Sequence, residues 1–274
     1  MEIDFHIHSC HSDGVLSVAE LVDLAISRGL KEFSITDHDT LAAYSSESLD
    51  NLDDIRVITG CEFSSVWNGR TVHILGLNLD ITSDAMNEAM NFQANAREQR
   101  AVHIAKNLEA KGMSGLLAGA RKYAQGAALG RPHFASYLVE QGFAKNNRQA
   151  FKKFLGDGKI GDVKTHWLPI EQVISWINRG GGIAVLAHPL KYAMTHTRLC
   201  ELLADFAAAS GRGIEVISGA QTPSQTQQLA NLALQFNFLS SAGSDFHRPG
   251  QRWADLGVVQ PLPESCTPVW SLWR

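Results

Sequence analysis

The chain has 274 residues, of which 45% are hydrophobic, and its formal net charge is −4. This length and composition allow a sizeable buried core, in one large α/β domain or two smaller ones, and argue against disordered and fibrous classes. The negative charge argues against broad electrostatic attachment to nucleic acid or to an anionic membrane, so a polyanionic substrate would need a local basic pocket.

Neither an export signal nor a membrane span is expected. No basic and then apolar leader follows Met1, and no stretch approaches about 18 uninterrupted apolar residues. The cysteines are widely separated and form no C-x-x-C pair, which favours reduced thiols over a disulfide framework. We therefore expect a cytoplasmic protein without a membrane partner or an obligate protein partner.

Short β-like runs alternate with helix-like stretches along the chain. The β-like runs are residues 2–7, 32–36, 56–59, 72–77, 183–187, 213–217 and 238–242. The first helix is introduced by a capping box, in which Glu20 follows Ser17 by three residues, and it ends at Gly29. Similar helical spacing occurs at residues 169–179, 197–209 and 224–236. This βα alternation predicts a parallel sheet, either open or closed into a barrel.

The alternation is interrupted between residues 83 and 164. A long helical pattern there gives way to shorter ones, with turn-prone segments at residues 126–132 and 156–161 and no convincing strand. We expect residues 83–164 to form a mainly helical insertion subdomain that covers the active site. Residues 1–82 and 165–274 would form the domain that carries the site.

Histidines and carboxylates recur at the ends of the β-like runs. His6 and His8 are two residues apart in the first run, so strand alternation points both to one face. Others follow or lie within later runs, and the carboxyl ends of adjacent strands converge in α/β folds. The candidate ligands are His6, His8, Asp13, His38, Glu62, His73, His188, Asp245 and His247. Imidazole and carboxylate ligands without thiolate suit Mn²⁺, Fe²⁺ or Zn²⁺ better than Mg²⁺.

Several other residues have two interpretations each. Asp37 could orient an imidazole or cap the turn after its strand. Arg131 and His133 could clamp a second phosphate or protonate a leaving oxygen, or they could simply flank Pro132 at a helix start. Arg97 and Arg100 share a helical face and could meet a nucleotide phosphate or form a solvated basic stripe.

The tryptophans also invite two interpretations. Base stacking is conceivable for Trp167, Trp176, Trp253, Trp270 and Trp273. Packing in the core or against the C-terminal tail is the default interpretation for all of them.

Four motifs of this chain resemble, in order, those of the PHP family, the polymerase and histidinol phosphatase superfamily. They are His6-x-His8 with Ser12-Asp13-Gly14, Thr36-Asp37-His38-Asp39, Ala187-His188-Pro189 and Ser244-Asp245-Phe246-His247. The resemblance implies a distorted TIM-like barrel of seven βα units and three divalent cations per chain, with manganese favoured. By resemblance, the ligand sets are His6, His8, Glu62 and Asp245; Glu62, His73 and His188; and Asp13, His38 and His247, with Glu62 bridging.

The resemblance is closest to family members that act on nucleoside 3′,5′-bisphosphates, some of which are also described as 5′-to-3′ exoribonucleases. It implies that a metal-bound hydroxide removes the 3′-phosphate, for example converting pAp to AMP and phosphate. The implied catalytic residues are Asp13, Glu62, His133 and Asp245. The implied substrate-binding residues are Asp13, His38, Arg97, Arg100, Arg131 and His133.

Three alternatives stay open at this point. The enzyme could trim short 5′-phosphorylated RNA, a reaction that could coexist with bisphosphate hydrolysis. Hydrolysis of histidinol phosphate is a weaker alternative, because Arg131 and His133 suggest an anionic far end of the substrate. A noncatalytic module stabilised by its metals is the alternative of a different class, although every ligand position is filled here.

Overall fold

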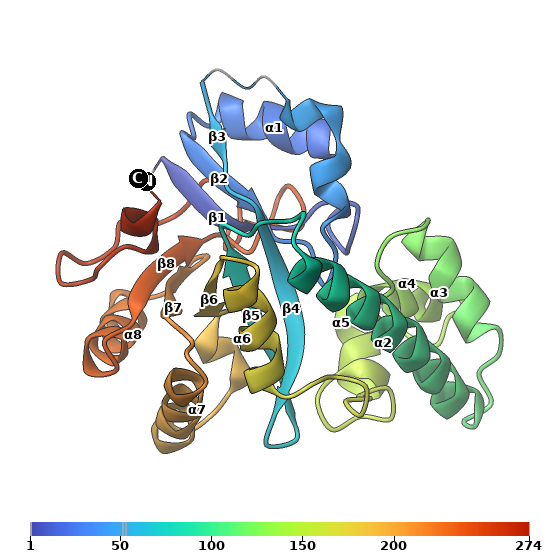
Figure 1. Ribbon diagram of the computed structural model, residues 1–274. Coiled ribbons are helices and arrows are strands. Elements are labelled where there is room, and N and C mark those ends of the chain that lie inside the picture. Colours follow the sequence, from blue (N-terminus) through green and yellow to red (C-terminus); the bar gives the residue numbers. More distant parts are fainter. Residues whose placement is uncertain (1, 51, 53, 274) are drawn as a thin grey trace.

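The structure is a computed structural model that describes residues 2–50, 52 and 54–273 (Figure 1). Within these residues, one sheet has the strand order β1-β2-β3 and the other β4-β5-β6-β7-β8. The strands are β1 (Ile3–Ile7), β2 (Glu32–Ile35), β3 (Arg56–Val57), β4 (Gly60–Trp67), β5 (Arg70–Leu77), β6 (Ile183–Leu186), β7 (Gly213–Ser218) and β8 (Leu239–Gly243). The fold is therefore of the α/β class. No helix among the described residues is long and apolar enough to cross a membrane.

Each predicted β-like run overlaps a strand, but β4 was not predicted. It pairs antiparallel with β5 through a hairpin whose turn residues, Asn68 and Gly69, have φ of 45° and 72°. An Asn-Gly pair favours this two-residue turn, so the signal was present in the sequence. The expectation of a wholly parallel sheet is wrong for β4–β5 and for β5–β6, which are antiparallel, whereas the other pairs are parallel.

The helices that follow the strands form where the apolar spacing predicted them. They are α1 (Val18–Ser27), α6 (Ile170–Arg179), α7 (His196–Ala208) and α8 (Pro223–Gln235), with short turns η1 (Ala42–Ser45), η2 (Glu47–Leu49), η4 (Pro189–Tyr192) and η5 (Val269–Leu272). The capping box of Ser17 and Glu20 is confirmed at the start of α1. The main core includes Phe63 and Ile74 from the second sheet, Trp176 from α6 and Phe206 from α7.

Residues 83–164 contain helices and no strand, as predicted. The elements are α2 (Asp84–Glu109), α3 (Leu116–Ala124), α4 (Arg131–Glu140), α5 (Asn147–Ala150) and the π-helical turn η3 (Phe151–Leu155). They lie together on one side of β4, with α2 running across the others (Figure 1). Ile104, Leu116 and Phe134 belong to a separate apolar cluster, whereas Ala85 and Met86 at the start of α2 pack into the main core. A separate insertion subdomain therefore stays a prediction.

The two sheets meet along two edges, and this junction positions the site. Asp245 N donates to His6 O at 2.9 Å and His8 N donates to Phe246 O at 2.8 Å, so β1 lies beside the end of β8. A Cβ on Gly243 would lie 2.7 Å from His6 N, so this approach requires glycine. At the other edge Asp39 N donates to Glu62 O at 3.0 Å. The seven-unit barrel itself stays a prediction from the resemblance.

Candidate metal centre

The first group of candidate ligands comes from β1, β4 and the loop after β8. His6 and His8 are fully buried and point the same way from β1, as strand alternation predicted. Their Nε2 atoms lie 3.3 and 3.2 Å from Glu62 Oε2, and 3.4 and 3.3 Å from Asp245 Oδ1. One ligand atom from each of these residues lies within 4.8 Å of the others. This is the first ligand set that the resemblance implied.

The other oxygen of Glu62 faces a second group. His188 Nε2 lies 2.8 Å and His73 Nδ1 lies 3.0 Å from Glu62 Oε1. His38 Nδ1 lies 3.1 Å from Glu62 Oε2, the oxygen that faces the first group, and His38 also clusters with Glu62 and His73. The carboxylate of Glu62 therefore stands between two sets of imidazoles, as a bridging ligand would.

The third group surrounds Asp13. His247 Nε2 lies 3.2 Å from Asp13 Oδ1, His8 Nδ1 lies 3.7 Å from the same atom, and His38 Nε2 lies 3.8 Å from Asp13 Oδ2. The structure thus places His8 and His38 each between two groups, a sharing that the resemblance did not imply. All of the predicted ligands lie in one contiguous cluster.

The cluster is lined by buried polar atoms without hydrogen bonds. Among the described residues they include His6 Nε2, His8 Nε2, Asp13 Oδ1, His38 Nδ1 and Glu62 Oε2. Leaving such atoms unpaired in the interior costs free energy, which cations bound among them would offset. The donor set of imidazoles and carboxylates fits divalent transition metals.

Electrostatics keep the carboxylates of the cluster ionised. Burial alone would raise the pKa of Glu62, but the charges of His38, His73 and His6 and a hydrogen bond from His188 hold that pKa well below its usual range. The pKa values of Asp13 and Asp245 are lowered in the same way by neighbouring histidines. Burial lowers the pKa of His188, which favours the neutral imidazole that metals bind, whereas for His6 and His8 the nearby carboxylates outweigh burial and raise the pKa.

Glu215 in β7 supports the cluster, and the sequence analysis missed it. It is fully buried; its Oε1 accepts a hydrogen bond from His6 Nδ1 at 2.9 Å, and its Oε2 accepts from His188 N at 2.6 Å. This contact leaves His6 Nε2 free to face the cluster. A carboxylate within an otherwise apolar strand, Gly-Ile-Glu-Val-Ile, was the available signal.

Asp37 holds a turn and does not contact an imidazole. It accepts hydrogen bonds from Ser9 N at 2.8 Å and from the hydroxyls of Ser9 and Ser12 at 2.5 Å each. The loop that carries Asp13 is fixed by these bonds. Lys191 in η4, which was also missed, forms an ion pair with Asp245.

The predicted phosphate-binding arginines line a cavity that opens on the cluster. This cavity of about 190 Å³ has Asp13, His38 and His73 on its wall together with Arg97, Arg100 and Arg131. Arg97 is neutralised by Asp39, at 2.7 Å, and Arg131 lies 3.4 Å from Asp162. Arg100 makes no ion pair with a carboxylate of the described residues.

Arg100 is held by neutral groups. Its Nε donates to Val163 O at 2.7 Å, and its guanidinium lies 5.1 Å from the centre of the Trp167 ring. Burial, reinforced by the nearby charges of Arg131 and Arg97, lowers the pKa of Arg100. Neither Arg97 nor Arg100 belongs to a solvated stripe, because both are buried. The cavity therefore carries a positive charge that an anion would balance.

His133 lies in the first turn of α4, which begins at Arg131. Its Nδ1 accepts a hydrogen bond from Gly130 N at 3.0 Å, and burial lowers its pKa. The neutral imidazole therefore carries its proton on Nε2. Pro132 lies in the first turn of α4, as the helix-start interpretation expected. Its neighbours are not solvated, however, because His133 is buried and Arg131 is half-buried and lines the cavity.

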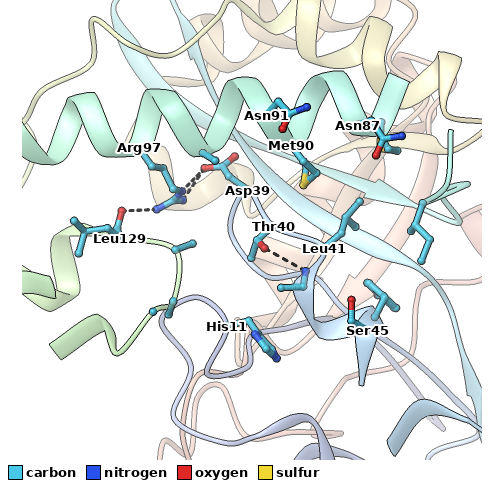
Figure 2. Close-up of a pocket in the computed structure, with 18 of the residues that line it drawn as sticks. His11, Asp39, Thr40, Leu41, Ser45, Asn87, Met90, Asn91, Arg97 and Leu129 are labelled. Atoms are coloured by element: carbon cyan, nitrogen blue, oxygen red, sulfur yellow. Dashed lines mark hydrogen bonds and ion pairs between the residues drawn. The ribbon is translucent and has the colours of Figure 1, made fainter. Parts of the chain in front are cut away.

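A larger cavity lies away from the ligand cluster. It measures about 660 Å³ and is lined by residues such as His11, Leu41, Met90 and Asn91, with none of the candidate ligands on its wall. Figure 2 shows the ion pair of Arg97 and Asp39 at its edge. Cavity volume alone therefore does not identify the site. The smaller cavities that open on the ligand cluster are the candidates for substrate binding.

Residues 4–145 match the PHP domain family. The chain is 42% identical over 268 residues to a 5′-3′ exoribonuclease of Haemophilus influenzae, covering 97% of each chain. It is 37% identical over 270 residues to a 3′,5′-nucleoside bisphosphate phosphatase of Chromobacterium violaceum, covering 98% of this chain and 95% of the relative. A solved structure described as an amidohydrolase from Chromobacterium violaceum, with bound SO4 and no metal, matches with a TM-score of 0.90 at 36% identity, covering 99% of this chain and 95% of that one.

Proposed function

The chain belongs to the PHP domain family, and on this premise we propose that it is a metal-dependent phosphoesterase that hydrolyses the 3′-phosphate of nucleoside 3′,5′-bisphosphates. One observation carries the proposal. The ligand cluster and the arginine cavity share Asp13, His38 and His73, so two sites for anions lie side by side. A substrate with two phosphates on one nucleoside matches this arrangement.

The residues of the cluster would hold about three divalent cations. We propose Mn²⁺, with Fe²⁺ and Zn²⁺ as alternatives, because the donor set of imidazoles and carboxylates suits all three. Such cations supply positive charge to phosphoryl oxygens and lower the pKa of an attacking water. Glu62 presents one oxygen to each of two histidine groups and so fixes their separation. Arg100 and Arg131 would hold the 5′-phosphate, while Asp39 fixes Arg97 on the wall of the same cavity.

In the proposed reaction, water oxygen bonds to the 3′-phosphorus and the bond from phosphorus to the 3′-oxygen breaks. His133, which holds a proton on Nε2, would give that proton to the leaving 3′-oxygen. The products are a nucleoside 5′-phosphate and inorganic phosphate. We propose direct attack without a phospho-enzyme. Because water attacks phosphorus, hydrolysis in ¹⁸O-water should place the label in phosphate, and label in the alcohol would instead show cleavage of the carbon–oxygen bond.

A second candidate is 5′-to-3′ exoribonuclease activity on short 5′-phosphorylated RNA. It is favoured by the 42% identity with the Haemophilus influenzae relative, and it breaks the same bond to a 3′-oxygen. Histidinol phosphate fits less well, because its cationic end would enter a cavity lined by arginines. A noncatalytic module fits less well too, since the cluster lies open to cavities that a substrate could enter.

The proposal also includes the cellular location, the partners and the barrel architecture. We place the enzyme in the cytoplasm, with small nucleotides and short RNA as its partners and no requirement for a protein partner or a membrane. A distorted seven-unit barrel of residues 1–82 and 165–274, covered by residues 83–164, is supported by the pairing of β1 with the end of β8.

The decisive experiment measures phosphate release from adenosine 3′,5′-bisphosphate by manganese-loaded protein and by its Asp245→Ala variant. The proposal would be supported if wild type released phosphate and the variant lost both this activity and its bound manganese. A 5′-phosphorylated dinucleotide should compete if both substrates use the same site. Absence of release from fully loaded wild-type protein would reject the bisphosphatase.

A further inference from the structure

The ligand cluster opens on a second cavity besides the arginine cavity. It measures about 440 Å³ and is lined by Asp13, Asp245 and His247 together with Arg248 and Trp253. Pro132 and Phe151 line both cavities and so form the wall between them. Its volume lies within the range of small-molecule sites. A substrate at the cluster can therefore extend towards Trp253 as well as into the arginine cavity. A further cavity of about 370 Å³ also opens on the cluster, at His73 and His188.

Trp253 is the aromatic feature of this second cavity. Its side chain is 64% exposed, whereas Trp67, Trp167, Trp176 and Trp270 are buried and Trp273 is half-buried. The default expectation of core or tail packing is thus wrong for Trp253. Its backbone is fixed, because its carbonyl accepts a hydrogen bond from Ala220 N at 2.6 Å. A large planar side chain is held at the mouth of the cavity with its ring free.

The second cavity also contains positive charge. Arg248 directly follows the candidate ligand His247, is exposed, and makes no ion pair with a carboxylate of the described residues. Lys191 on the same wall is already paired with Asp245. An exposed aromatic ring and an unpaired arginine that line the same cavity form the combination that binds single-stranded nucleic acid, through base stacking and phosphate contact.

The two candidate substrates, a nucleoside 3′,5′-bisphosphate and a 5′-phosphorylated RNA, differ in what the scissile phosphate carries opposite the 3′-oxygen. In a bisphosphate the scissile phosphate carries no further substituent. In a phosphodiester it carries the 5′-oxygen of the next nucleoside, which stays on phosphorus when the bond to the 3′-oxygen breaks. The upstream nucleotide, with its 5′-phosphate, takes the arginine cavity in the proposed function. The next nucleoside must leave the cluster through another opening.

We propose that the cavity at Trp253 receives the nucleoside that follows the scissile phosphate, with its base on the Trp253 ring and the succeeding phosphate at Arg248. This inference rests on the proposed function and assigns the cavity to RNA. It extends the function from mononucleotides to oligonucleotides. The larger cavity of Figure 2 is a poorer place for this nucleoside, because none of the candidate ligands lies on its wall.

The test compares two substrates that differ only downstream of the scissile phosphate. We would measure kcat/KM for pAp and for the 5′-phosphorylated dinucleotide pApA with manganese-loaded wild type, Trp253→Ala and Trp253→Phe. The ratio of kcat/KM for pApA to that for pAp should fall about tenfold in Trp253→Ala, mainly through KM, because stacking on an aromatic ring is lost. Trp253→Phe should keep most of the ratio. An unchanged ratio in Trp253→Ala would overturn the inference, even if both activities fell.

A binding measurement separates this inference from the proposed function. Calorimetric titration of the metal-free protein with pApA and with pAp should show Kd for pApA rising about tenfold in Trp253→Ala, with a smaller change for pAp. Tyr123→Ala, which removes an aromatic side chain that is 38% exposed outside this cavity, is the matched control. If wild type hydrolysed neither compound, the proposed function would fail, and the ratio of the Kd values would still decide the assignment of Trp253.

Discussion

Asp39 and Glu62 are carboxylates with 3% and 1% exposure, and their backbones are hydrogen-bonded to each other. Asp39 has a partner for each oxygen, since Oδ1 accepts from Ser64 N at 2.6 Å and Oδ2 accepts from Arg97 Nε at 2.8 Å. Glu62 Oε2 has no hydrogen bond, although nitrogens of His6, His8 and His38 lie 3.1 to 3.3 Å away. One carboxylate completes an ion pair, and the other faces a cluster of unpaired ligand atoms.

The contrast between Asp39 and Glu62 shows how a structural charge can be distinguished from a functional one at equal burial. A buried ion pair whose hydrogen bonds are complete gains little from binding a ligand, whereas removing one of its partners destabilises the fold. A buried cluster with orphaned donors and acceptors is stabilised only when something binds to it. We therefore expect substitutions around Glu62 to affect metal binding and catalysis, and substitutions around Asp39 to affect stability.

The largest effect is expected for Glu62→Gln. An amide cannot bridge cations as a carboxylate does, and the loss of charge stabilisation worth several kcal/mol should lower kcat/KM for pAp by at least about 10³-fold. Bound manganese, measured by mass spectrometry of the purified protein, should fall in parallel. A variant that lost its metals and kept its activity would contradict the assignment of the cluster.

Asp39→Ala should act on stability. Removing the carboxylate leaves the Arg97 guanidinium buried without a counter-charge, which should lower the free energy of unfolding by about 3 kcal/mol. Urea denaturation of the metal-free protein measures this change. Arg121→Ala, which breaks an exposed ion pair with Glu98, is the matched control and should cost less than about 1 kcal/mol. An equal loss in both variants would remove the distinction drawn between buried and exposed pairs.

Glu215→Gln should weaken metal binding while the fold persists. Glu215 is a positioning residue, because it orients His6 and does not itself face the cluster. The loss of such support typically raises the Kd for metal, or lowers activity, by about 10- to 100-fold. Titration with Mn²⁺ measures the Kd, and the urea midpoint of the metal-free variant shows whether the fold is intact. A shifted midpoint with an unchanged Kd would reduce Glu215 to a packing role.

Arg131→Ala should have the smallest effect of this series. Arg131 is one of several cations in the arginine cavity, so its loss should raise KM for pAp about tenfold with little change in kcat. The change in KM should be compared for a nucleoside 3′,5′-bisphosphate and a nucleoside 3′-phosphate, because only the bisphosphate has a 5′-phosphate that Arg131 could contact. Equal changes for both substrates would place the 5′-phosphate elsewhere.

The sequence predicted well which histidines and carboxylates would lie together, because their clustering follows from local rules. His6 and His8 share a face through strand alternation, and ligands such as His188 and Asp245 directly follow strands whose ends converge. The partners of Glu215 and Asp39 could not be predicted in this way. Glu215 meets His6 from 209 positions away and Asp39 meets Arg97 from 58 positions away, so only the packed structure brings them together. Strand β4 was also missed, but it could have been predicted, because the Asn68-Gly69 pair that follows it is typical of a two-residue hairpin turn.

The junction of β1 with the end of β8 has a consequence for how the protein is made. His6 and His8 emerge from the ribosome first, whereas Asp245 and His247 follow more than 200 residues later. Contacts between such distant segments form slowly during folding, because a long loop must close before they stabilise anything. The nascent chain therefore cannot assemble its full set of ligands until Asp245 and His247 have been synthesised. Complete metal loading should accordingly come after the segment that carries them has folded against β1.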